Sequence, residues 1–197
     1  GLVLSWWGVN WFVYVWIMKY LEEQWITPKI VWGTSVWSIF WAMISAWYTW
    51  IEMRNYVIEL ETRINEVKDI NWKNISKSTF TANINHTNWL IKWNRIKWEI
   101  SNLLKTKWIS KFNDLIIPYY LHIVDLNTAE DICISSLDDK YKNKWVLDYI
   151  RASISIPWVF PPYEIEGKYY VDWWVRSNYP ILSAPEIAFK NNIELDA

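Results

Sequence analysis

Ser35 is the residue whose type and setting most clearly permit covalent chemistry. It lies within "KIVWGTSVWSIFWAMISAW", which runs from Lys29 to Trp47. The apolar run that ends at Val31 predicts a strand, and the apolar run over residues 38–46 predicts a helix. A serine on the turn between a strand and a helix is typical of a nucleophile elbow, where strain exposes the hydroxyl and the positive helix end favours a developing oxyanion. We therefore take Ser35 as the first candidate nucleophile.

The elbow motif G-x-S-x-G is only half present. Gly33 supplies the first glycine, whereas Trp37 stands where the second is expected. Small residues flank an elbow serine because the backbone of the turn runs close to its neighbours, and an indole is hard to fit there. Taken alone, the stretch is equally compatible with an ordinary Gly-Thr-Ser turn before a buried helix.

The elements that must position this turn alternate between strand and helix. The N-terminal stretch predicts a strand over 2–5, a loop over 6–11 and a helix over 12–24. The inner face of that helix is expected to carry Phe12, Val15, Trp16 and Leu21. The strand and helix around Ser35 then complete a βαβα unit, which predicts an α/β sandwich with a mainly parallel central sheet.

The rest of the chain continues with helices and short strands. We expect helices over 51–67, 94–107, 144–155 and 185–190, a polar loop over 68–88, strands over 112–124, 131–135 and 169–171, and a hairpin turn at Glu166-Gly167. His86, in the polar loop, is expected to be solvated. His122, within a strand, is expected to be structural.

Length, charge and cysteine content restrict the classes of function. The 197 residues suit a single domain over 1–197, and the strand-like ending "IELDA" suggests an excerpt of a longer chain. With 20 basic and 21 acidic residues, a formal net charge of -1 gives no electrostatic case for nucleic acid. Cys133 is the only cysteine, which excludes an internal disulfide framework.

Glycine and tryptophan usage is abnormal. The chain has 4 glycines and 19 tryptophans, whereas an average glycine content of about 7% predicts roughly a dozen or more glycines. Tryptophan stands where turns and close contacts ask for the smallest residue, at Trp6, Trp7, Trp37, Trp47, Trp158, Trp173 and Trp174. We hypothesise that many of these positions are glycine in the natural protein, through a UGA codon that the source organism reads as glycine.

Two uncharged apolar stretches, residues 2–18 and 30–51, raise the alternative of a membrane protein with two spans. Both stretches contain turn or polar residues, and Pro28 lies between them. Restoring glycine at the suspect positions would also remove much of their hydrophobicity. We therefore rank this interpretation third.

Four collinear blocks resemble the patatin-like phospholipase family over essentially the whole chain. "SWWGVNW" at 5–11 resembles its glycine-rich oxyanion loop S-G-G-G-x-[RK]-G, and residues 33–37 resemble its elbow. "DWW" at 172–174 resembles its D-G-G motif, and "ASISIPWVFPPYEIEGKYYVD" is similar to its A-S-x-x-[IF]-P-x-x-F-x-P run. Tryptophan stands at nearly every position where the motifs require glycine, which supports the codon hypothesis.

The resemblance implies a three-layer α/β/α sandwich and a Ser-Asp catalytic dyad. It places the nucleophile on Ser35 and the base on Asp172, with no metal and no cofactor. The backbone amides of Trp6, Trp7, Gly8 and Val9 are expected to form the oxyanion hole. Gly33 and Trp37 belong to the elbow, and Trp173 and Trp174 to the D-G-G motif.

The activity implied is hydrolysis of lipid acyl esters, of the phospholipase A or lysophospholipase type. Its partners would be a lipid substrate and, transiently, a membrane or micelle surface, contacted near Phe160 or over residues 76–93. We expect a cytoplasmic or peripheral-membrane location, and secretion as an effector stays open. The second interpretation is a catalytically inactive lipid-binding protein with the same fold, which literal tryptophans in the motifs would give.

Overall fold

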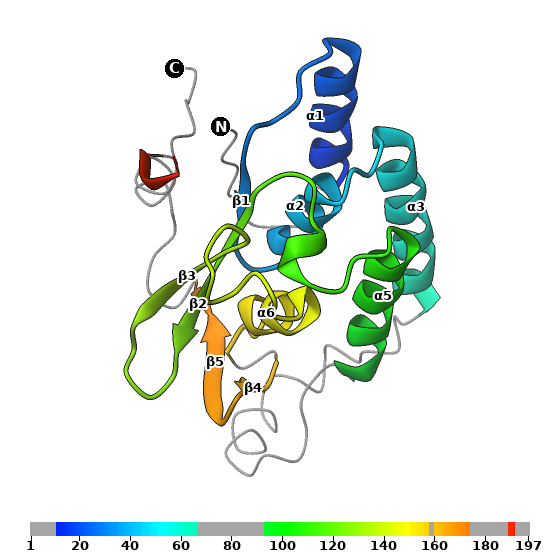
Figure 1. Cartoon of the computed structure of the whole chain (residues 1–197). Coiled ribbons are helices and arrows are strands. Elements are labelled where there is room, and N and C mark those ends of the chain that lie inside the picture. The colour runs from blue at the N-terminus through cyan, green and yellow to red at the C-terminus, as the bar shows by residue number, and fades with distance from the viewer. Residues whose placement is uncertain (1–10, 67–92, 158–159, 174–188, 192–197) are drawn as a thin grey trace.

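The computed structural model describes residues 11–66, 93–157, 160–173 and 189–191 (Figure 1). The elements are, in order, α1 (Trp11–Glu23), β1 (Val31–Gly33), α2 (Trp37–Ser45), α3 (Trp50–Glu66), α5 (Trp93–Thr106), the 3-10 helix η2 (Phe112–Asp114), β2 (Tyr119–Asp125), β3 (Asp131–Ser135), α6 (Val146–Ser153), β4 (Tyr163–Ile165) and β5 (Lys168–Asp172). The predicted helices up to residue 155 and the predicted hairpin are therefore present, with bounds shifted by one or two residues in each case.

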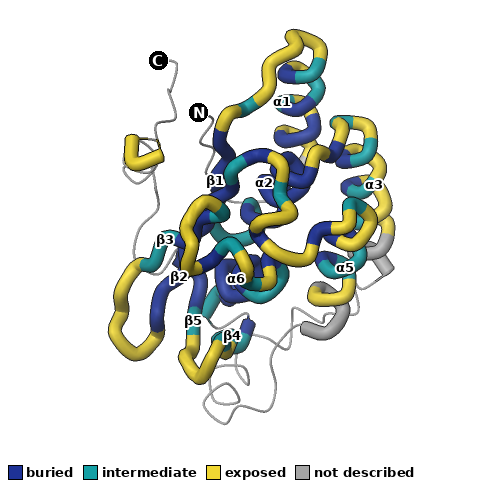
Figure 2. Tube along the Cα trace, in the orientation of Figure 1, coloured by how far each residue is buried: buried dark blue, intermediate teal, exposed yellow. Residues whose placement is uncertain are grey.

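Strand β2 is the centre of the described sheet. It pairs with β1 in parallel, through Val31 opposite Tyr119, and with β3 antiparallel over residues 120–124. Residues 123–125 of β2 pair antiparallel with β5, and β5 pairs antiparallel with β4. The fold is α/β, as predicted, and the described part of its sheet is mixed. Because β2 lies between its partners, its seven residues are all buried (Figure 2).

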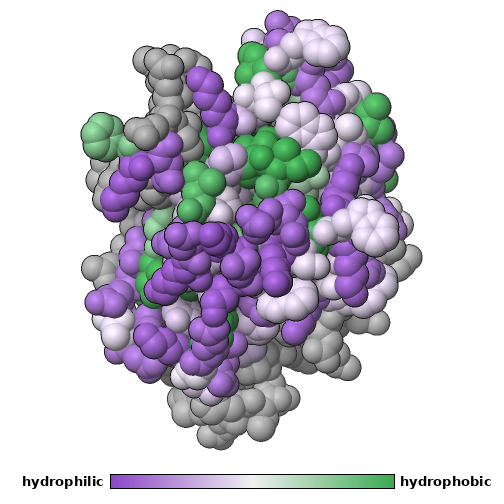
Figure 3. Space-filling view, viewed as in Figure 1, coloured by the Kyte–Doolittle hydropathy of each residue, from purple (hydrophilic) through white to green (hydrophobic). Residues whose placement is uncertain are grey.

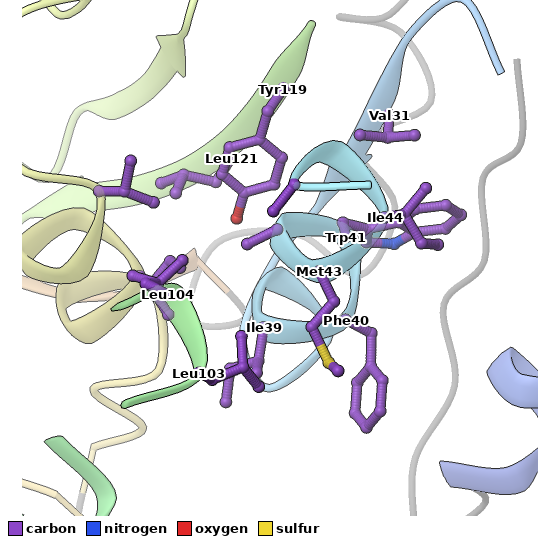
Figure 4. Close-up of a cluster of buried hydrophobic side chains, with 14 of the residues drawn as sticks. Val31, Ile39, Phe40, Trp41, Met43, Ile44, Leu103, Leu104, Tyr119 and Leu121 are labelled. Carbon is purple, nitrogen blue, oxygen red and sulfur yellow. The ribbon is translucent and has the colours of Figure 1, made fainter. Parts of the chain in front are cut away.

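The main core lies between this sheet and the helices. Helices α2 and α6 lie next to the strands, whereas α1, α3 and α5 lie farther out (Figure 1). Alternate residues of β2 enter this core, namely Tyr119, Leu121 and Ile123. Tyr119 and Leu121 face α2, whose residues 38–45 are all buried (Figure 4). The helix that follows Ser35 is thus anchored on its whole circumference, as expected for an element that must hold a turn rigidly.

Two predictions about individual elements were wrong in detail. On α1, Phe12 and Trp16 are exposed by 36% and 66%, because the helix packs with the neighbouring stripe Tyr14, Val15, Met18 and Leu21. The strand predicted over 112–124 begins only at Tyr119. The amides of Ile116 and Ile117 donate to the Ser45 carbonyl, at 2.9 and 3.2 Å, and Pro118 has no amide to donate, so no ladder can form there.

The proposed second membrane span does not exist as a helix. Residues 30–51 divide into β1, the turn at Ser35, the nine-residue α2 and the start of α3. In the described ranges, every helix is too short or too polar to cross a bilayer. The predicted strand over 2–5, the polar loop over 68–88 and most of the helix over 185–190 lie outside the described residues.

The start of α3 is fixed by a capping box that also receives a lysine from the end of α5. Glu52 accepts hydrogen bonds from the Thr49 amide at 2.8 Å and from Lys107 Nζ at 2.8 Å, and its own amide donates to Thr49 Oγ1 at 3.3 Å. Burial alone would raise the pKa of Glu52, but the hydrogen bonds from Lys107 and Thr49 outweigh it and lower this pKa below its ordinary value of 4.5.

We expect Glu52→Gln to destabilise the fold by about 0.5 kcal/mol at pH 7, because glutamine can still accept the Thr49 amide but loses the negative charge that pairs with Lys107 and with the N-terminus of α3. Because the pKa is lowered in the folded state, this contribution is present above the ordinary glutamate value of 4.5 and is lost as the pH falls through the lower folded value. Urea denaturation at pH 7 and near pH 3 measures the difference between the two proteins. A difference that stays constant with pH would contradict this account.

Candidate active site

Ser35 lies on a strained turn between β1 and α2. Its φ angle is +58°, a left-handed conformation that is uncommon for residues other than glycine. The side chain is half-buried. Its carbonyl accepts hydrogen bonds from the Ser38 amide at 3.0 Å and from Ser38 Oγ at 2.6 Å, which close the first turn of α2. The predicted strand–turn–helix geometry is therefore present, with the serine at the strained position.

The start of α2, which follows the turn at Ser35, is also hydrogen-bonded to β2. Tyr119, which is fully buried, donates its hydroxyl proton to the Ser38 carbonyl at 2.8 Å. Burial raises the pKa of Tyr119 well above its usual range, so the hydroxyl stays protonated and remains a donor. The first turn of α2 is thus held from the sheet as well as from within the helix.

Asp172 ends β5 and is fully buried. It lies opposite Ile123 of β2, and its amide donates to the Ser155 carbonyl at 3.0 Å. Because directly opposed residues of an antiparallel pair project to the same face, Asp172 shares a face with Ile123, which belongs to the main core. That is the face of the sheet on which α2 and α6 pack.

The end of α6 links the two candidate residues. The Ser35 amide donates to Ser153 Oγ at 3.0 Å, and Ser153 Oγ donates to the His122 carbonyl at 2.9 Å. The backbone amides of Ser35 and Asp172 therefore both donate hydrogen bonds to the three-residue segment 153–155. The fold brings them to the same end of α6 although 137 residues (172 − 35) separate them in sequence.

Ser153 and Ser155 lie in the run that resembles the family's A-S-x-x-[IF]-P-x-x-F-x-P motif. No role was predicted for them from the sequence. Both are fully buried. Ser155 Oγ accepts from Arg151 Nη1 at 2.5 Å, and Arg151 Nη2 donates to the Pro161 carbonyl at 3.2 Å. Burial lowers the pKa of Arg151 to about 9. The signal that could have identified the pair was two serines at the end of a helix, where side-chain hydroxyls commonly bond to nearby backbone.

Two of the motif tryptophans, Trp37 and Trp173, pack against aromatic rings. Trp37 is half-buried and stacks on Tyr14 of α1, with ring centroids 4.4 Å apart. Trp173 is buried and packs against His122, with centroids 5.6 Å apart. His122 itself is buried, and its Nδ1 lies 2.9 Å from Asp131 Oδ1. The pairing with Asp131 agrees with the structural role expected for His122.

Phe160, which was expected near a lipid-contacting loop, is buried. Its ring lies 6.0 Å from the guanidinium carbon of Arg151. Phe160 itself therefore packs inward. The predicted oxyanion-hole residues Trp6, Trp7, Gly8 and Val9 lie outside the described residues, as do Trp158, Trp174 and the stretch 76–92.

A serine on a strained turn between a parallel strand and a helix defines the nucleophile-elbow class of α/β proteins. Within that class, the model of the patatin-like phospholipase family matches residues 8–185. The chain therefore belongs to the patatin-like phospholipase family.

Curated relatives of this chain are fungal. It is 24% identical over 181 residues to Lysophospholipase NTE1 of Saccharomyces cerevisiae, covering 92% of this chain and 10% of that protein. It is 25% identical over 181 residues to Lysophospholipase NTE1 of Kluyveromyces lactis, covering 92% of this chain and 11% of that protein. The chain spans about a tenth of the length of these relatives.

Gly33 is in close contact with Trp41, one helical turn into α2. A Cβ atom at position 33 would lie 2.1 Å from Cδ1 of Trp41. Trp41 is fully buried beside β1, so its ring has little room to withdraw (Figure 4). With Trp41 in this position, residue 33 has no room for a Cβ atom, so only glycine fits there.

We expect Gly33→Ala to destabilise the chain by about 3 kcal/mol or to prevent folding, because overpacking in a core costs roughly 1–3 kcal/mol and this overlap is severe. In a Trp41→Gly background the same change should cost much less. The coupling between the two sites, from a double-mutant cycle in urea, should exceed about 1 kcal/mol. Additive effects would show that the overlap is relieved elsewhere.

Proposed function

We propose that the chain is an acyl hydrolase that cleaves carboxylic esters of lipids with Ser35 as nucleophile and Asp172 as base. The observation that carries this proposal is the strained Ser35 turn tied, through residues 153–155, to the strand end that holds Asp172. Strained non-glycine backbone persists only where surrounding structure holds it, and it concentrates at active sites.

The chemistry would proceed in two steps. Asp172 takes the proton of Ser35 Oγ as the oxygen attacks the ester carbonyl, and the tetrahedral oxyanion is stabilised by backbone amides and the positive end of α2. Collapse expels the alcohol, which takes the proton from Asp172, and leaves an acyl group on Ser35. Water, deprotonated by the same carboxylate, then hydrolyses the acyl-enzyme and restores the serine.

The family and the relatives together support the substrate class that we propose. The family is described as phospholipases, and the fungal relatives are named lysophospholipases. We therefore place single-chain phospholipids first among substrates and diacyl phospholipids second. The described surface in Figure 3 is mainly hydrophilic with small hydrophobic patches, which suits brief contact with a micelle or membrane surface.

A catalytically inactive lipid-binding protein is the second candidate for the chain with its tryptophans in place. Trp173, directly after Asp172, fills the space beside His122 with a buried indole. Trp37, at the last position of the elbow motif, fills the space beside Tyr14. An oxyanion loop needs backbone that approaches the substrate closely, which tryptophan side chains at Trp6 and Trp7 would obstruct.

We expect a chain with glycine at 6, 7, 37, 158, 173 and 174 to release fatty acid from lysophosphatidylcholine and p-nitrophenol from its acyl esters. In that background Ser35→Ala and Asp172→Asn should each lower kcat by about 10³-fold or more, as loss of a nucleophile or its base does in comparable enzymes. A fluorophosphonate should label Ser35 in the parent and not in Ser35→Ala.

Cys133→Ser serves as the control for nonspecific nucleophilicity, because Cys133 is the only thiol. It should leave turnover unchanged. Hydrolysis that survives Ser35→Ala would refute the proposed nucleophile. A folded, glycine-restored chain that binds vesicles and releases no fatty acid would favour the inactive lipid-binding protein instead.

A further inference from the structure

Three helices end in the same backbone motif, and each has tryptophan at the residue where this motif takes glycine. The tryptophans are Trp25 after α1, Trp47 after α2 and Trp108 after α5, with φ angles of 57°, 62° and 60°. In each case the tryptophan amide donates to the carbonyl three residues back, at 3.0–3.1 Å. The next amide donates to the carbonyl five residues back, at 2.8–3.0 Å. This is the Schellman motif, whose left-handed residue is usually glycine.

Among the described residues, the surroundings of these tryptophans do little to offset the strain. Trp25 and Trp108 are exposed by 94% and 90%, and Trp47 by 51%. An indole in water gains little from burial, while a side chain in the left-handed region clashes with its own backbone. Half of the described non-glycine residues with positive φ are tryptophans, although a bulky residue is the type least expected there.

A second set of tryptophans breaks a different rule, inside the core. Trp32, Trp41 and Trp173 are buried, with 6%, 0% and 4% exposure. Within the described part of the chain, the indole nitrogen of each lacks a hydrogen-bond partner. A buried tryptophan N–H normally finds an acceptor, because leaving it unbonded is costly. Trp41 in addition occupies the space that any side chain at Gly33 would need.

We infer that glycine occupies positions 25, 32, 41, 47, 108 and 173 in the protein as its source organism makes it. Backbone conformation, burial and unmet hydrogen bonding identify four of these positions, 25, 32, 41 and 108. The sequence motifs of the family are not needed for these four. The same residue type is misplaced in exposed turns, in a strand and in a helix. One codon with two meanings, UGA read as glycine by the organism, accounts for all of them.

The coding DNA is the first test, and UGA is expected at all six positions. UGG codons at the three helix ends would overturn the inference. Peptides from the protein purified from its source give the same answer by mass spectrometry. Each of the six residues should then have the mass of glycine.

Stability measurements on the chain as written are the second test. We expect Trp108→Gly to raise the folded-to-unfolded ratio about fivefold, because relief of left-handed strain outweighs the added freedom of glycine in the unfolded chain. Trp108→Ala keeps the Cβ atom and should gain little. Trp98, exposed by 56% within the same helix α5, is the matched control. Trp98→Gly should lower the ratio about twofold, and an equal loss for Trp108→Gly would contradict the inference.

A separate observation assigns a role to Ser153, and this second inference rests on the proposed function. We infer that Ser153 is a positioning residue for the nucleophile. A hydroxyl has one donor and two acceptor sites. The Ser153 hydroxyl donates its hydrogen bond to the His122 carbonyl and accepts one from the Ser35 amide. It thereby joins the strained turn to β2, next to Ile123, the residue that opposes Asp172.

Ser45 provides a matched control at the other end of α2. It is also fully buried, and its hydroxyl donates to the Ile117 carbonyl. In the glycine-restored chain, Ser153→Ala should lower kcat about 10- to 100-fold with KM unchanged, since small misplacements of a reacting group have effects of this size. Ser153→Thr keeps the hydroxyl and should recover most of the loss. Ser45→Ala should leave kcat unchanged.

Hydrogen exchange at the Ser35 amide gives a readout that is independent of turnover. Ser153→Ala should speed this exchange at least about tenfold, because the amide loses its acceptor, and Ser45→Ala should not. Unchanged exchange, or equal kcat in the two alanine variants, would overturn the role of Ser153. If the glycine-restored chain hydrolyses no ester but Ser153→Ala still speeds exchange at the Ser35 amide, the proposed function is refuted. The contact between Ser153 and the Ser35 turn is then still supported.

Discussion

A single buried hydroxyl connects the turn at Ser35, the end of α6 and the central strand β2. Ser153 lies at the end of α6, accepts the amide of the strained Ser35 and donates to β2 at His122. Left-handed backbone at a residue with a side chain costs roughly 1–3 kcal/mol and must be held by its surroundings. The turn at Ser35 is held on one side by Ser153 and on the other by Ser38, whose carbonyl is in turn fixed by Tyr119. The geometry of the candidate nucleophile therefore depends on α6 and β2 as much as on its own turn.

The local part of this arrangement could be predicted from the sequence, whereas the long-range part could not. Apolar periodicity located α2, α3 and α5 to within one or two residues, and Glu166-Gly167 marked the hairpin between β4 and β5. The serine at the strained position followed from its place between an apolar strand and an apolar helix. Periodicity has no information about which hydroxyl will accept an amide 118 residues away, and so it could not identify Ser153 as a partner of Ser35.

The same distinction explains the errors. The face of α1 was misjudged because Phe12 and Trp16 are as apolar as the residues that pack, and hydrophobicity alone does not choose between adjacent stripes. The strand over 112–124 was predicted too long because its apolar character continues upstream of Pro118. There, however, the backbone amides bond to the Ser45 carbonyl at the end of α2. In both cases a tertiary contact overrode a local pattern.

The tryptophans also bear on how much stability the chain can hold. Three left-handed helix ends at roughly 1–2 kcal/mol each already amount to a large share of the 5–15 kcal/mol by which a domain is usually stable. Each buried indole N–H without an acceptor adds a further cost of about 1–3 kcal/mol. Natural sequences are locally consistent with their folds, and departures concentrate at functional sites. Trp25 and Trp108 lie at exposed helix ends and take no part in the proposed chemistry, so that chemistry does not explain their strain. The simpler explanation is that the fold was selected with glycine there. Ser35, the strained residue for which we propose a chemical role, would remain strained in that sequence as well.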